Sequence, residues 1–570
     1  MSMPLDRLVA DNLNIWTSVI ERKTGAGRGG KGFSHFGIER LRELILDLAL
    51  RGKLVPQDAG DEPAQELYKR ICLSKAQGFP KGRFEIPATW CWVKFGQIAS
   101  FKPGRTPSRK DSRYWGGEHA WVSIADMVDG GDLSETAEKI SEIAADSVFR
   151  AGPSPAGSIL MSFKLTIGKI SRLAIPAYHN EAIITVSPSV KELDPFLFRF
   201  LPECARSGAL RNAIKGTTLN SDSIFEIAIP LPPLAEQRRI VAKVDQLMAL
   251  CDALERTSAE AMTAHQRLVE TLLATLVSAA DAADLACRWA RLERHFNTLF
   301  TTQTSIDALK QTILELAVRG KLVKQDVADG TAESSFKRVQ ALKRELILKK
   351  EIRKDKPSAI IAEGEVPFAI PDRWRWSRIG MIALSTEYGT SRKATSGGDG
   401  IHVLAMGNIQ SGVVNLDSDK SIPRESEELP ALLLQSGDIL YNRTNSYELV
   451  GKTGIFRFDT GDYTFASYLI RVRLDNQSME PEFLNIAMNT PYFRQTQVVP
   501  RITKQTGQAN VSGGAMRNMI VPMPPLPEQH RIVAKVAELM ALCDALKARL
   551  AAATATQRYL ATAMVERAAA

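Results

Sequence analysis

The sequence predicts a multidomain α+β protein, with two α+β domains separated by long antiparallel α-helical coiled-coil spacers in a pseudo-two-fold, circular organisation. Three observations lead to this fold class. A chain of 570 residues is too long for a single hydrophobic core. Several short segments occur twice in the same order. The stretches between them differ almost completely, so we interpret the repeated segments as scaffold and the stretches between them as separate readers.

Three motifs carry the duplication. They are Leu-Ala-x-Arg-Gly-Lys-Leu-Val, then Ile-Pro-x-x-Trp-x-Trp, then Pro-x-Pro-Pro-Leu-x-Glu-Gln-x-Arg-Ile-Val. Their positions are 48–55 and 316–323, 86–92 and 370–376, and 230–241 and 522–533.

The scaffold segments predict long helices. After each Pro-Pro motif, apolar residues step by four and three, the spacing of a coiled-coil seam. An outgoing helix is expected from Glu236 to about Ala280, which would be about 65 Å long. A returning helix precedes Gly320 and has a counterpart before Gly52, because glycine suits the left-handed position after a helix. The two seams are Ile240, Val244, Leu247, Cys251 and Leu254, and Ile532, Val536, Leu539, Cys543 and Leu546.

The distribution of these helices predicts that the two ends of the chain pack together. The central segment holds an outgoing and a returning helix, whereas the C-terminus supplies only the outgoing copy and the N-terminus only the returning one. An amphipathic stripe needs a partner. We therefore expect residues 38–50 to pair with residues 532–550, and the central helices to pair with each other.

These features predict six segments. In order, they are a leader of unassigned role (1–32), an N-terminal helical conserved region (33–83), a first variable domain (84–230), a central coiled-coil conserved region (231–367), a second variable domain (368–522) and a C-terminal helical conserved region (523–570).

Composition favours a polyanionic partner and an intracellular location. The formal charge is +9 and the pI is about 9.1, and Lys and Arg gain free energy by releasing phosphate counterions. No apolar run reaches the length of a membrane span, and residues 1–4 do not begin a signal peptide. We therefore expect a cytoplasmic protein. The six cysteines are scattered without zinc-ligand spacing, so reduced thiols and no metal site are expected.

Basic and polar loops in the first variable domain are candidates for contact with nucleic acid. The segment 101–115 is rich in Arg and Lys, which contact phosphates and guanine edges. A second polar loop precedes the Pro-Pro motif. A solvated surface loop is the alternative for each. The candidates are Lys102, Arg105, Thr106, Arg109, Lys110, Arg113, Lys215, Thr217 and Asn220.

The second variable domain is richer in amides and hydroxyls. Asn and Gln can bind adenine through two hydrogen bonds, as Arg can bind guanine. Any single residue among them could equally have a structural role. The candidates are Thr390, Ser391, Arg392, Lys393, Asn408, Asn442, Arg443, Asn445, Lys504, Gln505, Gln508 and Asn510.

Two motifs suggest catalysis but lack the surroundings that it requires. Residues 25–30 fit Gly-x-Gly-x-x-Gly without a preceding strand, and we interpret them as a flexible linker. Asn489-Thr490-Pro491-Tyr492 resembles, with one mismatch, a motif by which adenine methyltransferases hold a flipped base, but no glycine-rich cofactor strand lies upstream. No catalytic residue is therefore predicted in this chain.

The ordered motifs, each present twice around a divergent domain, resemble the specificity subunit of Type I restriction-modification systems over nearly the whole chain. The resemblance implies that each variable domain is a target-recognition domain that reads half of a bipartite double-stranded DNA site. It also implies that the helical spacers fix the gap between the halves and bind two modification (methyltransferase) subunits. Restriction (translocase/endonuclease) subunits complete such enzymes. S-adenosylmethionine, ATP and Mg are expected in the partner subunits, and no cofactor in this chain.

Two other readings remain open at the level of sequence. A stand-alone bipartite DNA-binding regulator would use the same geometry without a methyltransferase partner. A self-sufficient DNA methyltransferase would need a cofactor site that the motifs do not supply. The leader 1–32 departs from the family pattern.

Overall fold

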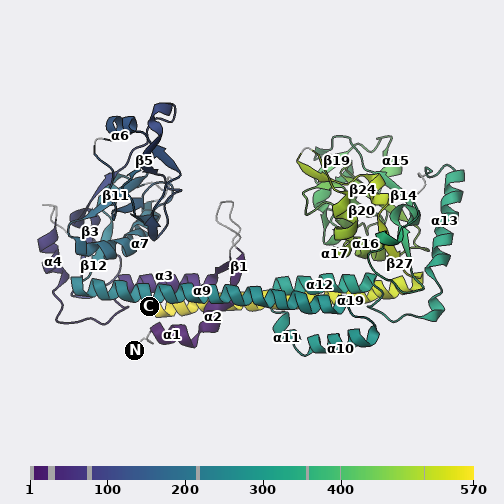
Figure 1. The fold of residues 1–570 in the computed structure, drawn as a ribbon, viewed down its shortest axis with the longest axis horizontal. Coiled ribbons are helices and arrows are strands. Elements are labelled where there is room, and N and C mark those ends of the chain that lie inside the picture. Colours follow the sequence, from purple (N-terminus) through teal and green to yellow (C-terminus); the bar gives the residue numbers. More distant parts are fainter. Residues whose placement is uncertain are drawn as a thin grey trace. The chain divides into compact units, whose positions relative to one another are not determined.

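The computed structural model describes residues 5–22, 33–72, 80–149, 151–212, 219–354, 359–397, 400–505 and 507–569. The chain forms two compact units. Unit 1 is Met1–Ala261 with Thr554–Ala570, and unit 2 is Met262–Ala553. Each unit combines one α+β domain with long helices (Figure 1).

Two helices of 44 residues each contribute to both units: α9 (Leu234–Val277) and α19 (Leu526–Ala569). The returning helices are α3 (Phe36–Leu50) and α12 (Gln303–Val318). These four helices confirm the predicted helical segments. Gly52 and Gly320 follow α3 and α12 with φ of 68° and 69°, in the left-handed conformation expected there.

In unit 1, α3 packs on the first part of α9 (Figure 1). Their apolar seams belong to one buried cluster, which includes Ile38, Ile45 and Ile240. Beside the seam, Arg42 donates hydrogen bonds to the carboxylates of Asp252 and Glu255 at 2.7 and 2.9 Å. The N-terminal conserved helix is therefore joined to the central outgoing helix by both apolar and ionic contacts.

The described part of the leader packs onto α3. It comprises α1 (Leu5–Asp11), α2 (Leu13–Ser18) and β1 (Ile20–Arg22), and β1 pairs antiparallel with β2 (Phe33–His35). Trp16 is fully buried, and its backbone lies so close to Gly37 that a Cβ there would be 2.5 Å from the Trp16 carbonyl oxygen. The Gly-rich segment 25–30, interpreted above as a linker, lies outside the described residues.

In unit 2, α12 packs on both long helices. Lys310 pairs with Asp544 and Lys547 pairs with Asp307, which links α12 to α19. The C-terminal end of α9 is capped by Lys321, which follows α12. Its ammonium donates to the carbonyl oxygens of residues 277 and 279 at 2.8 and 2.7 Å. Between α9 and α12 lie α10 (Ala282–Glu293) and α11 (Phe296–Leu299).

The predicted pairing of residues 38–50 with residues 532–550 is wrong. Residues 38–50 pack on α9 in unit 1, and residues 532–550 pack with α12 in unit 2. The end of α19 belongs to unit 1, where Arg558 lies 4.6 Å from the centre of the Phe36 ring. The N-terminal segment thus does contact the C-terminal helix, but through its last turns, because α19 is longer than its apolar motif indicated.

The duplicated motifs build the same contact in each unit. The carboxylate of Glu236 accepts from the Trp90 indole at 2.9 Å and from Gln57 at 2.6 Å. In unit 2, Glu528 accepts from the Trp374 indole at 3.0 Å and from Gln325 at 2.5 Å. Three motifs distant in sequence therefore meet at one buried carboxylate, which explains why they recur together.

The first α+β domain contains a five-stranded sheet in the order β4-β11-β8-β9-β6 and a three-stranded sheet in the order β10-β5-β7. The strands β3 and β12, near the two ends of this domain's sequence, pair with each other. The strands are β3 (Cys91–Lys94), β4 (Ala99–Pro103), β5 (Trp115–Val122), β6 (Gly131–Leu133), β7 (Glu138–Ile140), β8 (Ile159–Ser162), β9 (Ile170–Leu173), β10 (Tyr178–His179), β11 (Ile183–Pro188) and β12 (Ala228–Leu231). The helices are α4 (Ala64–Ile71), which precedes the domain, and α5 (Phe95–Ile98), α6 (Glu142–Val148), α7 (Asp194–Asn212) and α8 (Ser221–Phe225).

The second α+β domain repeats this strand order despite its different sequence, and it has one further strand at the edge of each sheet, β17 and β15. Its sheets run β14-β24-β20-β22-β18-β17 and β15-β19-β16-β23, its ends pair as β13-β27, and a small sheet β21-β26-β25 is added. In both domains the main sheet is antiparallel except for one parallel pair, β6 with β9 or β18 with β22. The strands are β13 (Arg375–Arg378), β14 (Ala383–Tyr388), β15 (Thr395–Ser396), β16 (Ile401–Leu404), β17 (Ile409–Gln410), β18 (Gly412–Val414), β19 (Lys420–Ile422), β20 (Ile439–Asn442), β21 (Thr444–Asn445), β22 (Thr453–Ile455), β23 (Tyr463–Phe465), β24 (Leu469–Leu474), β25 (Thr503–Gln505), β26 (Gln508–Asn510) and β27 (Ile520–Met523).

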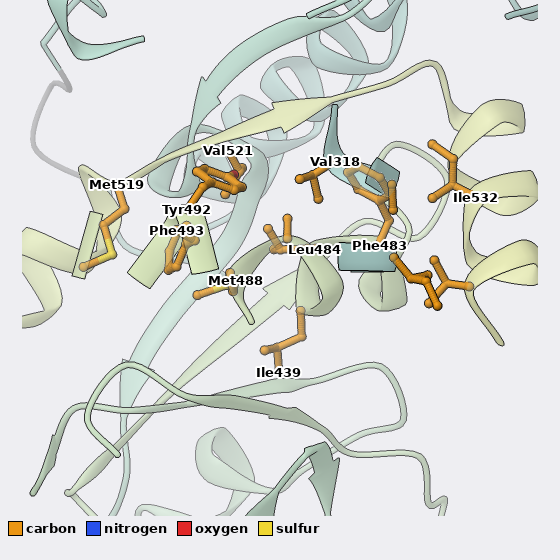
Figure 2. Close-up of a cluster of buried hydrophobic side chains, with 14 of the residues drawn as sticks. Val318, Ile439, Phe483, Leu484, Met488, Tyr492, Phe493, Met519, Val521 and Ile532 are labelled. Carbon is orange, nitrogen blue, oxygen red and sulfur yellow. The ribbon is translucent and has the colours of Figure 1, made fainter. Parts of the chain in front are cut away.

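One apolar core joins the second domain to the helices of unit 2 (Figure 2). It brings together Val318 at the end of α12, Ile439 of β20, Phe483 of α16 (Pro481–Met488) and Ile532 of α19. All four side chains are fully buried. The other helices of unit 2 are α13 (Ala332–Leu348), α14 (Ile379–Ile382), α15 (Leu429–Leu432), α17 (Pro491–Phe493) and α18 (Gly513–Arg517).

Candidate nucleic-acid interface

The two α+β domains hold equivalent loops after the edge strands β4 and β14 of their main sheets. After β4, the amide of Arg105 donates to the carbonyl of His179 at 2.8 Å, and after β14 the amide of Thr390 donates to the carbonyl of Phe465 at 2.8 Å. The glycine before each is required by packing, because a Cβ on Gly104 or Gly389 would lie about 2 Å from the same carbonyl oxygen. The basic loop of one domain and the hydroxyl-rich loop of the other therefore occupy the matching place.

Two of the five predicted cations in the first loop, Arg109 and Arg113, have a carboxylate partner. Arg109 forms two hydrogen bonds to Glu138, at 2.6 and 2.8 Å, and its guanidinium lies 3.9 Å from the centre of the Trp115 ring. Arg113 forms an equivalent pair with Asp111 at 3.0 and 2.8 Å. These contacts hold both side chains in place while leaving more than half of each exposed.

The other candidates of this loop lie at the surface. Lys102 and Lys110 are exposed, and Arg105 reaches the carbonyl of residue 148 at 3.4 Å. The Thr106 hydroxyl donates to Glu181. That hydrogen bond, with a smaller contribution from Lys164, lowers the pKa of the Glu181 carboxyl, so this group is an anion at neutral pH.

In the second domain, the loop after β14 is divided between structural and exposed residues. Thr390 is buried and donates to Glu428, whose carboxylate also lies 3.6 Å from Arg392. Ser391 and Lys393 are exposed. Residues 391–393 are therefore the part of this loop that is exposed and able to contact a partner.

Among four predicted amides, one is exposed and caps a helix, and the other three are buried. Asn220 caps α8 by accepting from the Ser223 amide at 2.7 Å. Asn408 is buried, with its amide nitrogen donating to the carbonyl of residue 417 at 2.9 Å. Asn442 and Asn510 are also buried. The side-chain oxygen of Asn510 accepts a hydrogen bond from the Thr444 hydroxyl at 2.9 Å. The hydrogen bonds of Asn220, Asn408 and Asn510 are structural, because a short amide in a turn or strand satisfies neighbouring polar groups as readily as it could a base.

The remaining candidates of the second domain come together around the end of β20. Arg443 lies 5.0 Å from the Tyr388 ring centre and donates to the carbonyl of Ser467 at 3.3 Å. Asn445 of β21 pairs with Ala509 of β26. Lys504 and Gln508 are exposed on β25 and β26. Lys215, Thr217 and the side chain of Gln505 lie outside the described residues.

Exposed aromatic side chains beside Arg443 were not predicted. Tyr388 and Tyr468 are 46 and 47% exposed, and the amide of Arg443 donates to the carbonyl of Tyr468 at 3.0 Å. Exposed tyrosines around an arginine suit contact with nucleic acid, whose bases and phosphates need both apolar and charged partners. Their signal in the sequence is weak, because a tyrosine in a strand is more often part of a core.

The methyltransferase-like motif has a structural role. The Asn489 side-chain amide donates to the Thr453 hydroxyl at 2.7 Å, and the Tyr492 backbone amide donates to the Glu315 carboxylate at 2.7 Å. Tyr492 is buried, and burial raises the pKa of its phenol well above 10. The motif therefore joins the second domain to α12.

His179 lies inside the first domain and has a structural role. It is buried and bonded to the Thr185 hydroxyl at 2.7 Å. Burial lowers its pKa to about 4, so the imidazole is neutral at pH 7. Among the described residues, no three His, Cys, Asp or Glu side chains gather in a metal-binding group. In that same part of the chain, no helix is both long and apolar enough to cross a bilayer.

Comparison with known proteins assigns the family. Residues 87–263 and 371–553 match the family described as Type I restriction modification DNA specificity domain. The Type I restriction enzyme EcoEI specificity subunit of Escherichia coli is 33% identical, and the match covers 99% of each chain. The EcoAI specificity subunit of Escherichia coli is 32% identical over the same shares. This chain therefore belongs to the Type I restriction-modification DNA specificity family.

A solved structure also matches this chain. The HsdS subunit from Thermoanaerobacter tengcongensis is 18% identical to this chain, with a TM-score of 0.37, and the match covers 86% of this chain and 98% of that one.

Proposed function

We propose that this chain is the DNA-recognition subunit of a Type I restriction-modification complex and that it reads a bipartite double-stranded DNA target. Residues 84–230 would read one half-site, and residues 368–522 the other. The observation that carries this proposal is the pair of domains with one strand order and equivalent loops of different chemistry. A shared frame with different loops is what two readers of different half-sites need, because base edges are read by side chains in loops or helices.

The helices are proposed to act as antiparallel coiled-coil spacers with pseudo-two-fold, circular organisation. Two observations support this role. The contacts of Glu236 and Glu528 repeat in both units with the same partners. Each returning helix packs on one of the two long helices, as the contacts of Arg42 and Lys310 illustrate. Readers held by rigid elements match half-sites at a fixed separation.

The partners proposed for this chain are two modification subunits, which would methylate adenine using S-adenosylmethionine, and restriction subunits that use ATP and Mg. The chain would supply no catalytic residue or cofactor and would work in the cytoplasm. The duplication supports two copies of one partner: Leu250 on α9 and Leu542 on α19 occupy the same position of the repeat and are 42 and 60% exposed. Similarity to restriction-enzyme subunits over 99% of the chain favours this role over a stand-alone regulator.

The proposal is tested by expressing the chain with its modification subunit in a host free of adenine methylation and mapping methylated adenines across the genome. We expect one motif made of two defined half-sites with a constant undefined gap. Expression of the modification subunit alone is the control and should leave the genome unmethylated. A continuous motif, or methylation that does not depend on this chain, would refute the proposal.

A further inference from the structure

Both recognition domains place a tight loop directly after a central strand. In the first domain the loop follows β8, and the Phe163 amide donates to the carbonyl of Ala182 at 2.9 Å while its own carbonyl accepts from Leu219 at 3.1 Å. In the second domain Arg443 makes the same two contacts, with Tyr468 at 3.0 Å and Val511 at 2.8 Å. Phe163 and Arg443 are thus equivalent positions, and the residues after them begin equivalent loops.

The ends of these loops are equivalent too. The amide of Gly168 donates to the carbonyl of Ser162 at 2.9 Å, and the amide of Gly451 donates to the carbonyl of Asn442 at 2.8 Å. Both glycines have positive φ, of 77° and 90°. The loops are therefore residues 164–167 in the first domain and 444–450 in the second, which adds three residues between the same two anchor points.

Leu165 stands at the tip of the first loop in a strained conformation. Its φ is +65°, a region that side chains other than glycine rarely occupy. The amide of Thr166 donates to the carbonyl of Lys164 at 2.7 Å, which makes Leu165 the centre of a γ-turn of the strained type. The Leu165 side chain is 83% exposed, so the strain is not offset by burial.

The surrounding residues hold this turn in place. The side chain of Ser162 is fully buried, and its hydroxyl donates to the carbonyl of Thr166 and accepts from the Lys169 amide at 3.0 Å. An exposed leucine in a strained turn fixed by a buried hydroxyl is costly for folding alone, and such strain is concentrated at binding sites. Lys164 stands next to it and supplies a positive charge beside the apolar tip.

From this geometry we propose that Leu165 is a specificity-determining residue of the first half-site, where its side chain contacts the C5-methyl group of one thymine in the major groove. Apolar contact with this methyl group is the way an aliphatic side chain distinguishes a base edge. In the second domain Asn445 is likewise the second residue after the anchor, Arg443, so the two loops begin with an apolar residue and an amide at this distance from the anchor. This inference rests on the proposed function, because it assigns a base contact within the first half-site.

The test uses the whole complex of the chain with its modification subunits and a DNA duplex that contains the recognition site found by methylation mapping. Each thymine of the first half-site is replaced in turn by deoxyuridine, which lacks only the methyl group. The wild-type complex should bind one of these duplexes about fourfold more weakly, the effect of one buried methyl group. Leu165→Ala should weaken binding of the unmodified duplex by a similar factor and be insensitive to that same deoxyuridine.

Two controls separate the contact from folding. Leu165→Asn places a residue that tolerates positive φ at the turn, so the melting temperature of this variant should equal or exceed that of wild type. Its binding should no longer distinguish that thymine from deoxyuridine. Deoxyuridine in the second half-site should affect wild type and Leu165→Ala equally. If Leu165→Ala binds like wild type, or if no thymine methyl couples to Leu165, the inference is overturned although the bipartite site stands. If the wild-type complex has no bipartite site, the proposed function itself fails.

Discussion

At the scale of single residues, the buried carboxylates explain the repeated motifs best. Glu528 is 1% exposed and accepts hydrogen bonds from Trp374 and Gln325. Glutamine at this position would direct an N–H group at one of two N–H donors, so Glu528→Gln should destabilise unit 2 by about 1–3 kcal/mol. Chemical denaturation should detect the loss. Glu528→Gln with wild-type stability would show that these hydrogen bonds contribute little.

The same residue predicts a dependence on pH. Burial raises the pKa of Glu528 above its ordinary value of 4.5, so the folded state binds more protons than the unfolded state between that value and the raised pKa. Stability contributed by this group therefore increases as the pH falls through that window and is lost as the pH rises. The melting temperature of wild type relative to Glu528→Gln should increase from pH 7 towards pH 5. A constant or decreasing difference would contradict the assigned burial.

Sequence reasoning at this scale found positions better than roles. The loop 101–115 and residues 388–393 lie in equivalent places, because Gly104 and Gly389 mark the same close approach of two backbone segments. Asn408 and Asn442 were candidates for contact with DNA, and the structure buries both, because burial is decided by strand order, which short amide-rich runs do not reveal. Leu165 was missed, because a single leucine carries no sign of a positive φ.

At the scale of elements, the glycine after each returning helix controls how the helix meets its domain. A Cβ on Gly320 would lie 2.5 Å from Cγ of Pro371, and φ there is +69°. Gly320→Ala should lower the free energy of unfolding by about 1–2 kcal/mol for the backbone alone, with a further loss from the clash. Gly461→Ala is the matched control, because Gly461 has φ of +68° and no atom within 4 Å of the added Cβ. Equal losses in the two variants would argue against a packing role.

The C-terminal end of α19 provides a second test. Ala561 is fully buried in the cluster that includes Ile15 and Phe36, whereas Ala555 on the same helix is exposed. Ala561→Asp would bury a charge without a partner and should destabilise unit 1 by about 2–5 kcal/mol, while Ala555→Asp should be nearly neutral. Hydrogen exchange should show faster exchange in α3 for the first variant alone. Unchanged protection in α3 would mean that the chain ends fold independently.

Helix prediction succeeded because a seam of period 3.5 is local information, whereas helix pairing is not. The seam around Ile240 located α9, but two equivalent seams cannot tell which copy packs against which. The length of α19 explains the observed pairing. Its turns beyond Leu546 carry mostly alanine in place of large apolar residues, and they still reach the core of unit 1.

At the scale of the whole molecule, the spacer is the feature that should set the gap between half-sites. The boundary between the units crosses both α9 and α19, after Ala261 and Ala553. Four residues add about 6 Å and turn a helix by roughly 400°, which nearly restores its face. Four-residue insertions at both points should therefore lengthen the undefined gap and leave both half-sites unchanged, as adenine methylation mapping would report. An active double insertion with the original gap would show that these helices are not the ruler.

The multidomain architecture was predictable because duplication is visible without any structure, and the shared strand order was not, because it survives almost complete sequence divergence. Residues 84–230 and 368–522 have few identical residues, yet their main sheets have the same strand order, β4-β11-β8-β9-β6 and β14-β24-β20-β22-β18. The loops carried by that frame are where the two domains differ, and the central claim is that those loops separately read the two half-sites.

Exchange of one domain tests that claim most directly. Residues 84–230 are replaced by the corresponding domain of a relative with a different target, and the methylated adenines of the host are mapped with the chain's own modification subunit. The account predicts a new first half-site, the original second half-site and an unchanged gap. A change in both half-sites, or in neither while the exchanged protein is folded and active, would contradict it.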